Sequence, residues 1–421
     1  MEYTKEEVAK HNKCDDCWVH IDNKVYDLTK FMENHTGGND PLQIAGGDAT
    51  HLFYSIHPKS AKKILMSDDF IKKYYKGNLI EKEKEKDNNQ TQHNSVFYTD
   101  LREKVDKYLE TNKIPIRDSF KYKVYSIFKI VLFFICYHYV FNRKKSILLF
   151  LIPMVMLDFM IGVGIAHEAH HGGIARPKWF RWFIKKFSLI TINGGWSYYW
   201  MWDHNVRHHG YTNEENDRDK FYTKYIRLSK YSPKMDIHKW QHIFSWFGYL
   251  IGLMKGKFLM DGWELTYTSS SILEKITHII FKSLWYFLFW IYPIMKFGFE
   301  KIWMCIFYQL LVGIYYDTLF VINHNQKENE YPEYETNDFC KKQIIHSSNY
   351  SSGSHIVNLL TGGLNHQIEH HVFPSYSHHT YPYIHKVLKE VCSEKNIPYN
   401  SYKNVFKAIT SHYDYLKYMG S

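Results

Sequence analysis

Four apolar segments, each long enough to cross a lipid bilayer, constrain this chain more than any other feature. They are residues 124–141, 146–166, 276–295 and 302–322. As helices they would extend roughly 27–32 Å, which matches a hydrocarbon core of about 30 Å. Buried helices of a large soluble protein are the alternative reading of such segments. We expect an all-α polytopic membrane domain with about four transmembrane helices and additional cytosolic helices.

Charged residues around these segments bear on their orientation. Five basic residues lie between positions 176 and 186, just after the second segment, and cytoplasmic loops are enriched in Lys and Arg. A basic run at 142–145 argues for the opposite orientation. The polar N-terminus does not resemble a secretory signal. We expect the N-terminal region and the 176–186 loop to lie in the cytosol.

Net charge and cysteine content exclude little. The chain has 53 Lys and Arg against 43 Asp and Glu, a net charge of +10, but no nucleic-acid-binding motif accompanies this excess. We therefore expect no nucleic-acid partner. The six cysteines fit a reducing compartment, since Cys14 and Cys17 alone form a CxxC and lack the further ligands or βαβ context of a zinc or redox site.

A charged and then amide-rich stretch, "EKEKEKDNNQTQHNS" at 81–95, is too polar to bury a core. It divides the chain into a domain at 1–80, a flexible linker at 81–97 and a membrane domain at 98–421. In the first domain, His35 and His57 each stand beside apolar residues. Two imidazoles that face each other across an apolar crevice can bind one haem iron axially.

Three histidine-rich groups follow the linker at helical spacing. In "HEAHH", His167 and His171 are four residues apart, so one helical face would carry both. In "WDHNVRHH", His204 and His208 repeat that spacing, with His209 adjacent and able to reach a second metal.

The third group, "QIEHH", places a glutamine where a histidine might stand. Gln367 lies three and four residues before His370 and His371, again on one helical face. Its amide oxygen can coordinate a metal or position a metal-bound water. Imidazole suits zinc, copper, iron and nickel, and eight or more candidate ligands are enough for two metals with open positions.

Three acidic residues lie inside or beside these segments. Glu168 and Glu369 are expected to orient imidazoles rather than to bind metal themselves. Asp158, within the second apolar segment, is costly in lipid and should face the bundle interior or a substrate channel. A structural hydrogen bond to a neighbouring helix is the alternative for Asp158.

The N-terminal region resembles a cytochrome b5 domain. "WVHIDNKVYDLTKF", "HTGG" and "GGDATHLFYSIH" follow the order of that family across residues 1–80. The resemblance implies a small α+β haem-binding domain that carries haem b, with His35 and His57 as the axial ligands.

Three other residues of this region are assigned by the same resemblance. His20 and His51 are expected to be ordinary surface residues. Thr36 stands where the family usually has proline after the first ligand, and the loss of a fixed φ at that position could loosen the turn that aims His35.

The whole chain resembles the front-end fatty acyl desaturases, membrane enzymes with a fused cytochrome b5 domain. The most specific segments are "HEAHH", "HNVRHHGYTN", "HSSNYSSGS" and "GGLNHQIEHHVFPS". The family's third box begins with glutamine, as Gln367 does here. The resemblance implies two non-haem iron ions bound by His167, His171, His204, His208, His209, Gln367, His370 and His371. His324, in "VINHN", resembles an additional ligand, whereas His170 and His366 are expected to be neighbours of the site.

The resemblance also implies the reaction and its partners. An O2-dependent desaturase of this type inserts a cis double bond between an existing double bond and the carboxyl end, as Δ5 or Δ6 enzymes do. The substrate would be a fatty acyl chain on coenzyme A or phospholipid, and NADH-cytochrome b5 reductase would supply electrons. We expect a multi-pass protein of the endoplasmic reticulum membrane, surrounded by membrane lipid, with the haem domain and active site on the cytosolic side.

Two other readings remain open at this stage. A sphingolipid desaturase or a fatty acid hydroxylase with a fused cytochrome b5 would use a similar site. A membrane-tethered electron carrier, whose histidines bind structural zinc, is the non-enzymatic alternative. Product analysis separates the first pair from a front-end desaturase, and metal analysis separates the carrier from all of them.

Overall fold

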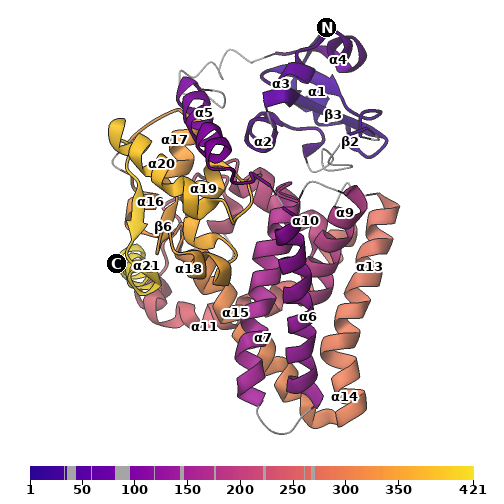
Figure 1. Cartoon of the computed structure of the whole chain (residues 1–421), viewed down its shortest axis with the longest axis vertical. Helices are drawn as coiled ribbons and strands as arrows, with labels where there is room; N and C mark the ends of the chain where they lie inside the picture. The colour runs from indigo at the N-terminus through magenta and orange to yellow at the C-terminus, as the bar shows by residue number, and fades with distance from the viewer. Residues whose placement is uncertain are drawn as a thin grey trace.

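The computed structural model describes residues 1–32, 34–35, 44–57, 59–80, 95–117, 119–142, 147–174, 177–220, 224–259, 261–266, 271–332 and 334–421. Thr36, most of the linker and most of the basic run at 142–145 lie outside these residues. Figure 1 shows a small N-terminal domain seated above one end of a larger helical part. The chain thus has the α+β domain and the helical membrane domain that the sequence predicts.

The N-terminal domain is built on a five-stranded sheet of order β1-β5-β4-β3-β2. β1 and β5 pair in parallel and the other neighbours are antiparallel. Asp22 and Asn23 turn the β3–β4 hairpin with positive φ angles of 48° and 61°, the conformation that a tight hairpin turn requires. The elements are β1 (Glu2–Tyr3), α1 (Lys5–Val8), β2 (Asn12–Lys13), β3 (Asp16–Ile21), β4 (Lys24–Asp27), α2 (Thr50–Ile56), α3 (Lys59–Leu65), α4 (Asp68–Tyr74) and β5 (Tyr75–Leu79).

The prediction that His20 and His51 are surface residues is wrong, because each is only 6% exposed. His20 lies on β3 with its Nδ1 3.6 Å from Asp48. His51 lies on the face of α2 that meets the helical part of the chain. Local sequence could not show that face to be covered, since the residues that cover it come from far along the chain.

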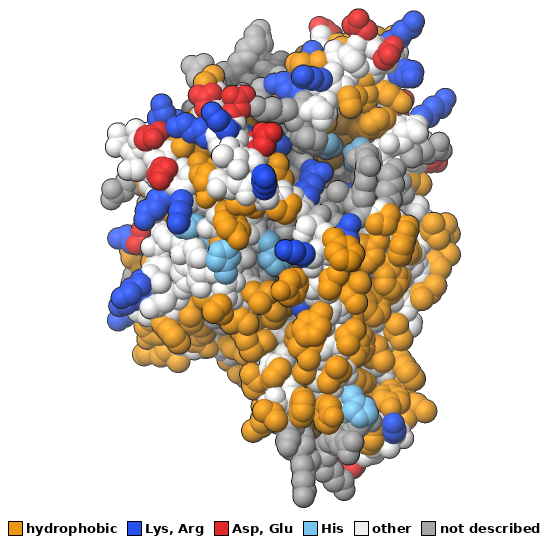
Figure 2. Space-filling view, in the orientation of Figure 1, with side chains coloured by type: hydrophobic (Ala, Val, Ile, Leu, Met, Phe, Trp, Pro, Cys, Tyr) orange, Lys and Arg blue, Asp and Glu red, His pale blue; other side chains and the backbone are white. Residues whose placement is uncertain are grey.

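Four helical stretches of the described chain are long and apolar enough to cross a membrane. They are Phe120–Phe141, Leu148–His170, Ile272–Phe297 and Phe299–Val321, within a few residues of the predicted segments. Their outward side chains are apolar, and Figure 2 shows hydrophobic side chains over the lower part of the molecule, with charged ones mainly above. The elements are α6 (Phe120–Asn142), α7 (Ile147–Ile161), η3 (Gly162–His167), α8 (Glu168–His170), α13 (Ile272–Tyr286), η8 (Phe287–Ile291), α14 (Tyr292–Phe297), η9 (Phe299–Lys301) and α15 (Ile302–Val321).

The remaining elements lie before the first stretch, between the second and the third, or after the fourth. One feature differs from the all-α expectation for this part, because β6 and β7 form a short parallel pair. The elements are α5 (Val96–Thr111), α9 (Lys178–Lys186), η4 (Phe187–Ile192), α10 (Ser197–Trp202), η5 (Asp203–His208), η6 (Arg218–Lys220), η7 (Asp236–Trp240), α11 (Gln241–Leu259), α12 (Asp261–Thr266), α16 (Lys327–Glu330), α17 (Phe339–Ile345), β6 (Ser348–Tyr350), α18 (His355–Leu360), η10 (Leu364–His366), α19 (Gln367–Val372), α20 (Tyr381–Glu394), β7 (Asn400–Tyr402) and α21 (Val405–Gly420).

Helix α5 joins the N-terminal domain to the helical part. Ser95 caps it by accepting a hydrogen bond from the Tyr98 backbone N–H at 3.1 Å, so the first two residues of the helix, Val96 and Phe97, lie inside the predicted linker. Its apolar face, Leu101, Val105 and Leu109, packs in one cluster with residues of α17, α19 and α20. The helix that follows the linker is therefore anchored against the element that carries the third histidine group.

Asp158 forms hydrogen bonds with residues of other helices. Its carboxylate is fully buried and accepts from Asn193 Nδ2 at 2.6 Å and from the Tyr308 hydroxyl. Tyr316 donates to the Asp158 carbonyl at 3.0 Å. These contacts join α7, η4 and α15, so they support the hydrogen-bonding role for Asp158 rather than a channel-lining one.

Candidate metal centre

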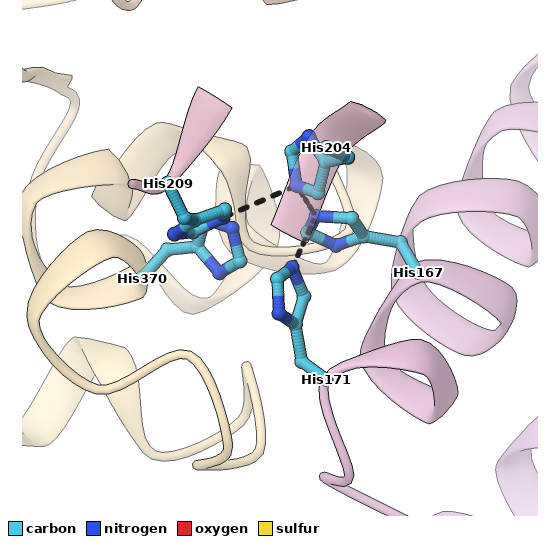
Figure 3. A group of neighbouring side chains, drawn as sticks. All are labelled: His167, His171, His204, His209 and His370. Atoms are coloured by element: carbon cyan, nitrogen blue, oxygen red, sulfur yellow. Dashed lines mark hydrogen bonds between the residues drawn. The ribbon is translucent and has the colours of Figure 1, made fainter. Parts of the chain in front are cut away.

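Five histidines from three separate elements converge in one buried cluster, which we call cluster one. Figure 3 shows their rings pointing toward one another from the η3–α8 junction, from η5 and from α19. Their ligand nitrogens all lie within 4.8 Å of one another: His167, His171, His204, His209 and His370. His167 Nε2 lies 2.9 Å from His204 Nε2 and 3.2 Å from His171 Nε2.

Three further histidines form a second buried group, cluster two, beside the first. They are His208, His324 and His371, with ligand nitrogens within 4.8 Å of one another. Gln367 Nε2 lies 2.9 Å from His324 Nε2, and Asn323 Nδ2 donates to Gln367 Oε1 at 3.3 Å. Gln367 therefore faces the same space as the inward nitrogen of His324, and presenting its amide oxygen there requires the amide group to turn over.

The pairing within the second box differs from the sequence prediction. We expected an α-helical His204–His208 pair, with His209 reaching a second metal. The segment is instead a π-helix, η5, in which the His209 N–H donates to the His204 carbonyl at 3.0 Å. A π-helix repeats at i+5, so His204 and His209 share cluster one while His208 belongs to cluster two. His208 nevertheless stays beside His204, because these two residues and Asp219 form a third group with ligand atoms within 4.8 Å of one another.

Hydrogen bonds to Nδ1 fix the ring orientation in cluster two. His324 Nδ1 donates to the His346 carbonyl at 3.0 Å, and His371 Nδ1 donates to Gln343 Oε1 at 2.7 Å. His208 Nδ1 lies 3.2 Å from Asp217 Oδ1. Each of these rings therefore turns Nε2 inward as the ligand atom, because a partner on Nδ1 sets the tautomer and orientation of a metal-binding imidazole.

The electrostatic setting favours neutral imidazoles at nearly every position outside the membrane spans. Burial, together with neighbouring imidazoles, holds the pKa of His171, His204, His209, His370 and His371 well below the ordinary value. His208 is the exception. Burial lowers its pKa, but the carboxylates of Asp217 and Asp219 outweigh burial and raise the pKa of His208 to about 9.

Four residues near the boxes have other partners. His170 bonds the Ala166 carbonyl and Ser197, and His366 bonds Asn358 and the Gly353 N–H, so both stand outside the clusters. The expectation that the two glutamates orient imidazoles holds for Glu168, whose partner is however His378 and not a box histidine, and is wrong for Glu369. Glu168 bonds His378, and Glu369 accepts from Asn349 and Tyr399, because burial leaves each carboxylate facing a different element.

The two clusters fit metal ions. Metal–imidazole bonds of about 2.0–2.1 Å at neighbouring coordination positions place nitrogens about 3.0–3.4 Å apart, and the observed separations are 2.9–3.2 Å. Nε2 of His370 and of His371 is buried and has no hydrogen-bond partner in the described part of the chain. Buried polar atoms without partners are costly, and a cation would satisfy them.

Sequence reasoning missed Asp217 and Gln343, since residues that hydrogen-bond a ligand have no spacing pattern of their own.

The haem-ligand pair is also brought together. His35 Nε2 and His57 Nε2 lie 3.5 Å apart, and His57 Nδ1 lies 3.2 Å from the Phe53 carbonyl. Two opposed metal bonds of about 2.0–2.1 Å need about 4 Å between the nitrogens, so the pair lies within about half an ångström of axial spacing. Phe53 and Phe31 flank the two rings and provide an apolar wall. The donor set therefore fits one haem iron.

A narrow cavity of about 10 Å³, room for about one water molecule, adjoins His167 and His370 in cluster one. Gly362 and Gly363 line it with positive φ angles of 56° and 95°, and a Cβ at Gly362 would lie 2.6 Å from the Gly164 backbone N. Glycine is thus required where the loop after α18 approaches η3. Val163, Leu364 and Pro374 provide its apolar walls.

Comparison with known proteins places these features in families. The model described as "Fatty acid desaturase" matches residues 145–403, and the model described as "Cytochrome b5-like Heme/Steroid binding domain" matches residues 4–80. Both clusters lie within the first match and the His35–His57 pair within the second.

Curated relatives match over nearly the whole chain. The "Delta(5) fatty acid desaturase A" of Dictyostelium discoideum is 28% identical over 100% of this chain and 94% of its own length. The "Acyl-lipid (8-3)-desaturase" of Physcomitrium patens is 29% identical over 99% of this chain and 91% of its own length. The protein of the same name from Mortierella alpina is 27% identical over 99% of this chain and 97% of its own length. The chain therefore belongs to the fatty acid desaturases, a family of oxidoreductases, and carries a fused cytochrome b5-like domain at its N-terminus.

Proposed function

We propose that this protein is a front-end desaturase that inserts a cis double bond between an existing double bond and the carboxyl end of a polyunsaturated acyl chain. Position Δ5 is the one we favour, because all three relatives reported above are named Delta(5) or (8-3) desaturases, and the HxxxHH spacing of the second box supports the same choice. The observation that carries the proposal is the pair of buried histidine clusters.

The proposed ligands divide between the clusters. His167, His171, His204, His209 and His370 would hold one iron ion, and His208, His324 and His371 the other, with Gln367 as ligand or as the residue that positions a ligand water. Two iron ions held there would supply the oxidising power to remove one hydrogen from each of two adjacent methylenes. In the balanced reaction, one O2, two electrons and two protons yield the double bond and two waters.

The chain's own residues would prepare that chemistry. Asp217, Gln343 and the His346 carbonyl hold three imidazoles with Nε2 inward, so little reorganisation is needed at the site. Val163, Leu364 and Pro374 line the adjoining cavity, which has room for about one water molecule, and would limit the access of water to cluster one. Positioning one carbon pair beside the clusters would set the regiochemistry.

The electron supply would come from the fused domain. We propose haem b bound by His35 and His57, reduced by NADH-cytochrome b5 reductase. The domain boundaries that we propose are 1–80 for the haem domain, 81–97 for the linker and 98–421 for the membrane domain. Four apolar helices agree with a multi-pass membrane protein, and we place it in the endoplasmic reticulum with clusters and haem domain on the cytosolic side.

Expression in a yeast without polyunsaturated lipids tests the proposal. Cells are fed single polyunsaturated acids, and products are identified by gas chromatography with mass spectrometry. The expected result is a new Δ5 double bond in an acid that already carries a more distant one. A hydroxylated product would instead indicate a hydroxylase, and conversion of sphingoid bases alone would indicate a sphingolipid desaturase.

A further inference from the structure

Helix α2 carries the haem ligand His57 at its carboxyl end, and that end is bound by the membrane domain. The Tyr98 hydroxyl donates to the Tyr54 carbonyl at 3.2 Å, and Arg102 Nη1 donates to the His57 carbonyl at 3.1 Å. Arg117 Nη2 donates to the Ile56 carbonyl at 3.3 Å. The last carbonyls of a helix have no partner within it, so side chains from outside α2 satisfy three carbonyls at its end.

Charge reinforces these contacts. The carboxyl end of a helix has partial negative charge, and two guanidinium groups, Arg102 and Arg117, face it. Arg102 is buried and also bonds the Tyr98 hydroxyl at 3.3 Å, which fixes both donors on one face of α5. Tyr98 stacks on Phe373, just after α19, the helix that carries His370. The His57 carbonyl is thus connected through Arg102 and Tyr98 of α5 to Phe373, which directly follows the helix that carries His370.

The other end of α2 reaches the second histidine box. His51 is buried, and its Nε2 donates to the Asn205 carbonyl at 3.2 Å. Asn205 lies on η5 between His204 and His208, one residue of each cluster. Gly210 leaves room for this approach, because a Cβ there would lie 3.0 Å from His51 Nε2. A single seven-residue helix therefore spans from a haem ligand to the backbone of the candidate ligands.

We propose that this interface is the electron-transfer position of the haem domain, held by His51, Arg102 and Arg117 as positioning residues. The inference rests on the proposed function, since it concerns the route by which electrons reach the clusters. The route runs from His57 along α2 to His51, and then through the Asn205 carbonyl into η5. Because the haem domain is already docked, diffusion of that domain on its linker does not limit the rate of electron transfer.

The test compares wild type with four variants of the full-length protein in lipid nanodiscs: His51→Phe, His51→Gln, Arg102→Ala/Arg117→Ala and the triple variant that combines His51→Phe with both arginine changes. Lys104→Ala is the matched control, because Lys104 is an exposed cation on the same helix that pairs with Glu394. Haem content and non-haem iron are measured first in each. Ferrous haem is then mixed with O2 and an acyl substrate, and its reoxidation is followed at several solvent viscosities.

We expect wild type and Lys104→Ala to reoxidise at one rate that does not depend on viscosity. Removal of three side-chain hydrogen bonds should lower the docked-to-undocked ratio by about 100-fold, so the triple variant reoxidises more slowly and its rate falls with viscosity. Hydrogen exchange at the α2 amides should rise in the same variant. His51→Gln, which keeps a donor, should recover part of the rate lost in His51→Phe.

Two results would overturn the inference. One is a triple variant with full haem and iron whose haem reoxidises at the wild-type rate. The other is hydrogen exchange at the α2 amides that is as fast in wild type as in the triple variant. If the arginine changes release metal or haem, the inference is tested by His51→Phe and His51→Gln instead. Wild-type reoxidation rates in both would then overturn it. Failure of the proposed function looks different, because wild type would then show no substrate-dependent haem reoxidation and no desaturated product.

Discussion

His204 and His209 lie on one face of the π-helix η5, with their Nε2 atoms 3.2 Å apart. His208, between them in sequence, points to the other cluster. One short segment therefore supplies both candidate metal sites. The i+5 repeat places His209 with His204, and the His208 ring still stacks on the His204 ring with centroids 5.3 Å apart.

Loss of His208 should disable cluster two. That cluster has only three imidazoles, so His208→Ala should lower non-haem iron and abolish product while the haem Soret band remains. Iron per chain and double-bond product per milligram of membrane protein are the measurements. His138→Ala, at an exposed histidine of α6, is the control and should match wild type. Wild-type product from His208→Ala would remove this residue from the site.

Asp217 should act through His208. Asp217→Asn removes the carboxylate that orients Nδ1, so iron affinity should fall by about 10–100-fold although every candidate ligand remains. Iron retention is measured during a chelator titration of purified protein. Glu215→Gln, an exposed acidic neighbour, should retain iron as wild type does. Equal retention in Asp217→Asn would show that the carboxylate does not support the ligand.

Gln367 should be required although it is not a histidine. Gln367→Ala should abolish product, because the side chain faces the same space as His324 Nε2. Gln367→His should retain part of the activity, because it restores a metal-binding nitrogen. Gln367 is buried, so the protein level of the variant is matched to wild type to separate loss of the site from loss of stability. Full product from Gln367→Ala, at matched protein level, contradicts the assignment.

The haem ligands should be separable from the iron site. His35→Ala or His57→Ala should abolish the Soret band and most of the product while non-haem iron remains. The host must lack a free cytochrome b5, which could replace the fused donor. Undiminished product from a haem-free variant in such a host argues against the fused electron supply.

Asp158 should affect stability more than product. Asp158→Ala leaves Asn193 and Tyr308 without their buried acceptor and should cost about 2–5 kcal/mol, seen as a lower thermal midpoint in nanodiscs. The position of the double bond should not change. A change of regiochemistry at unchanged stability would indicate that Asp158 lines the substrate channel.

The sequence predicted the parts of this fold that depend on local pattern. Length and hydropathy located four candidate spans to within a few residues, because a bilayer imposes one length on every helix that crosses it. Box spacing identified the histidines that converge, His204 and His208 included, although it assumed an α-helix where the segment is a π-helix. Nothing in local sequence distinguishes a π-helical turn from an α-helical one here.

Contacts between distant residues were beyond such reasoning. His51 appeared to be a surface residue because its partner, Asn205, lies more than a hundred residues away along the chain. Glu168 and Glu369 appeared to serve the neighbouring histidines, whereas tertiary packing gives them His378 and Tyr399. Sequence proximity is a poor guide to the partner of a buried polar group.

Metal analysis combined with product analysis on the same purified, haem-loaded wild-type protein tests the central claim most directly. The two clusters predict about two non-haem iron ions per chain, together with a Δ5 double bond in the fed polyunsaturated acid. His370→Ala, prepared in parallel, should lose iron and product while its Soret band stays intact. Zinc in place of iron, or a His370→Ala protein that still desaturates at the wild-type level, would contradict the account.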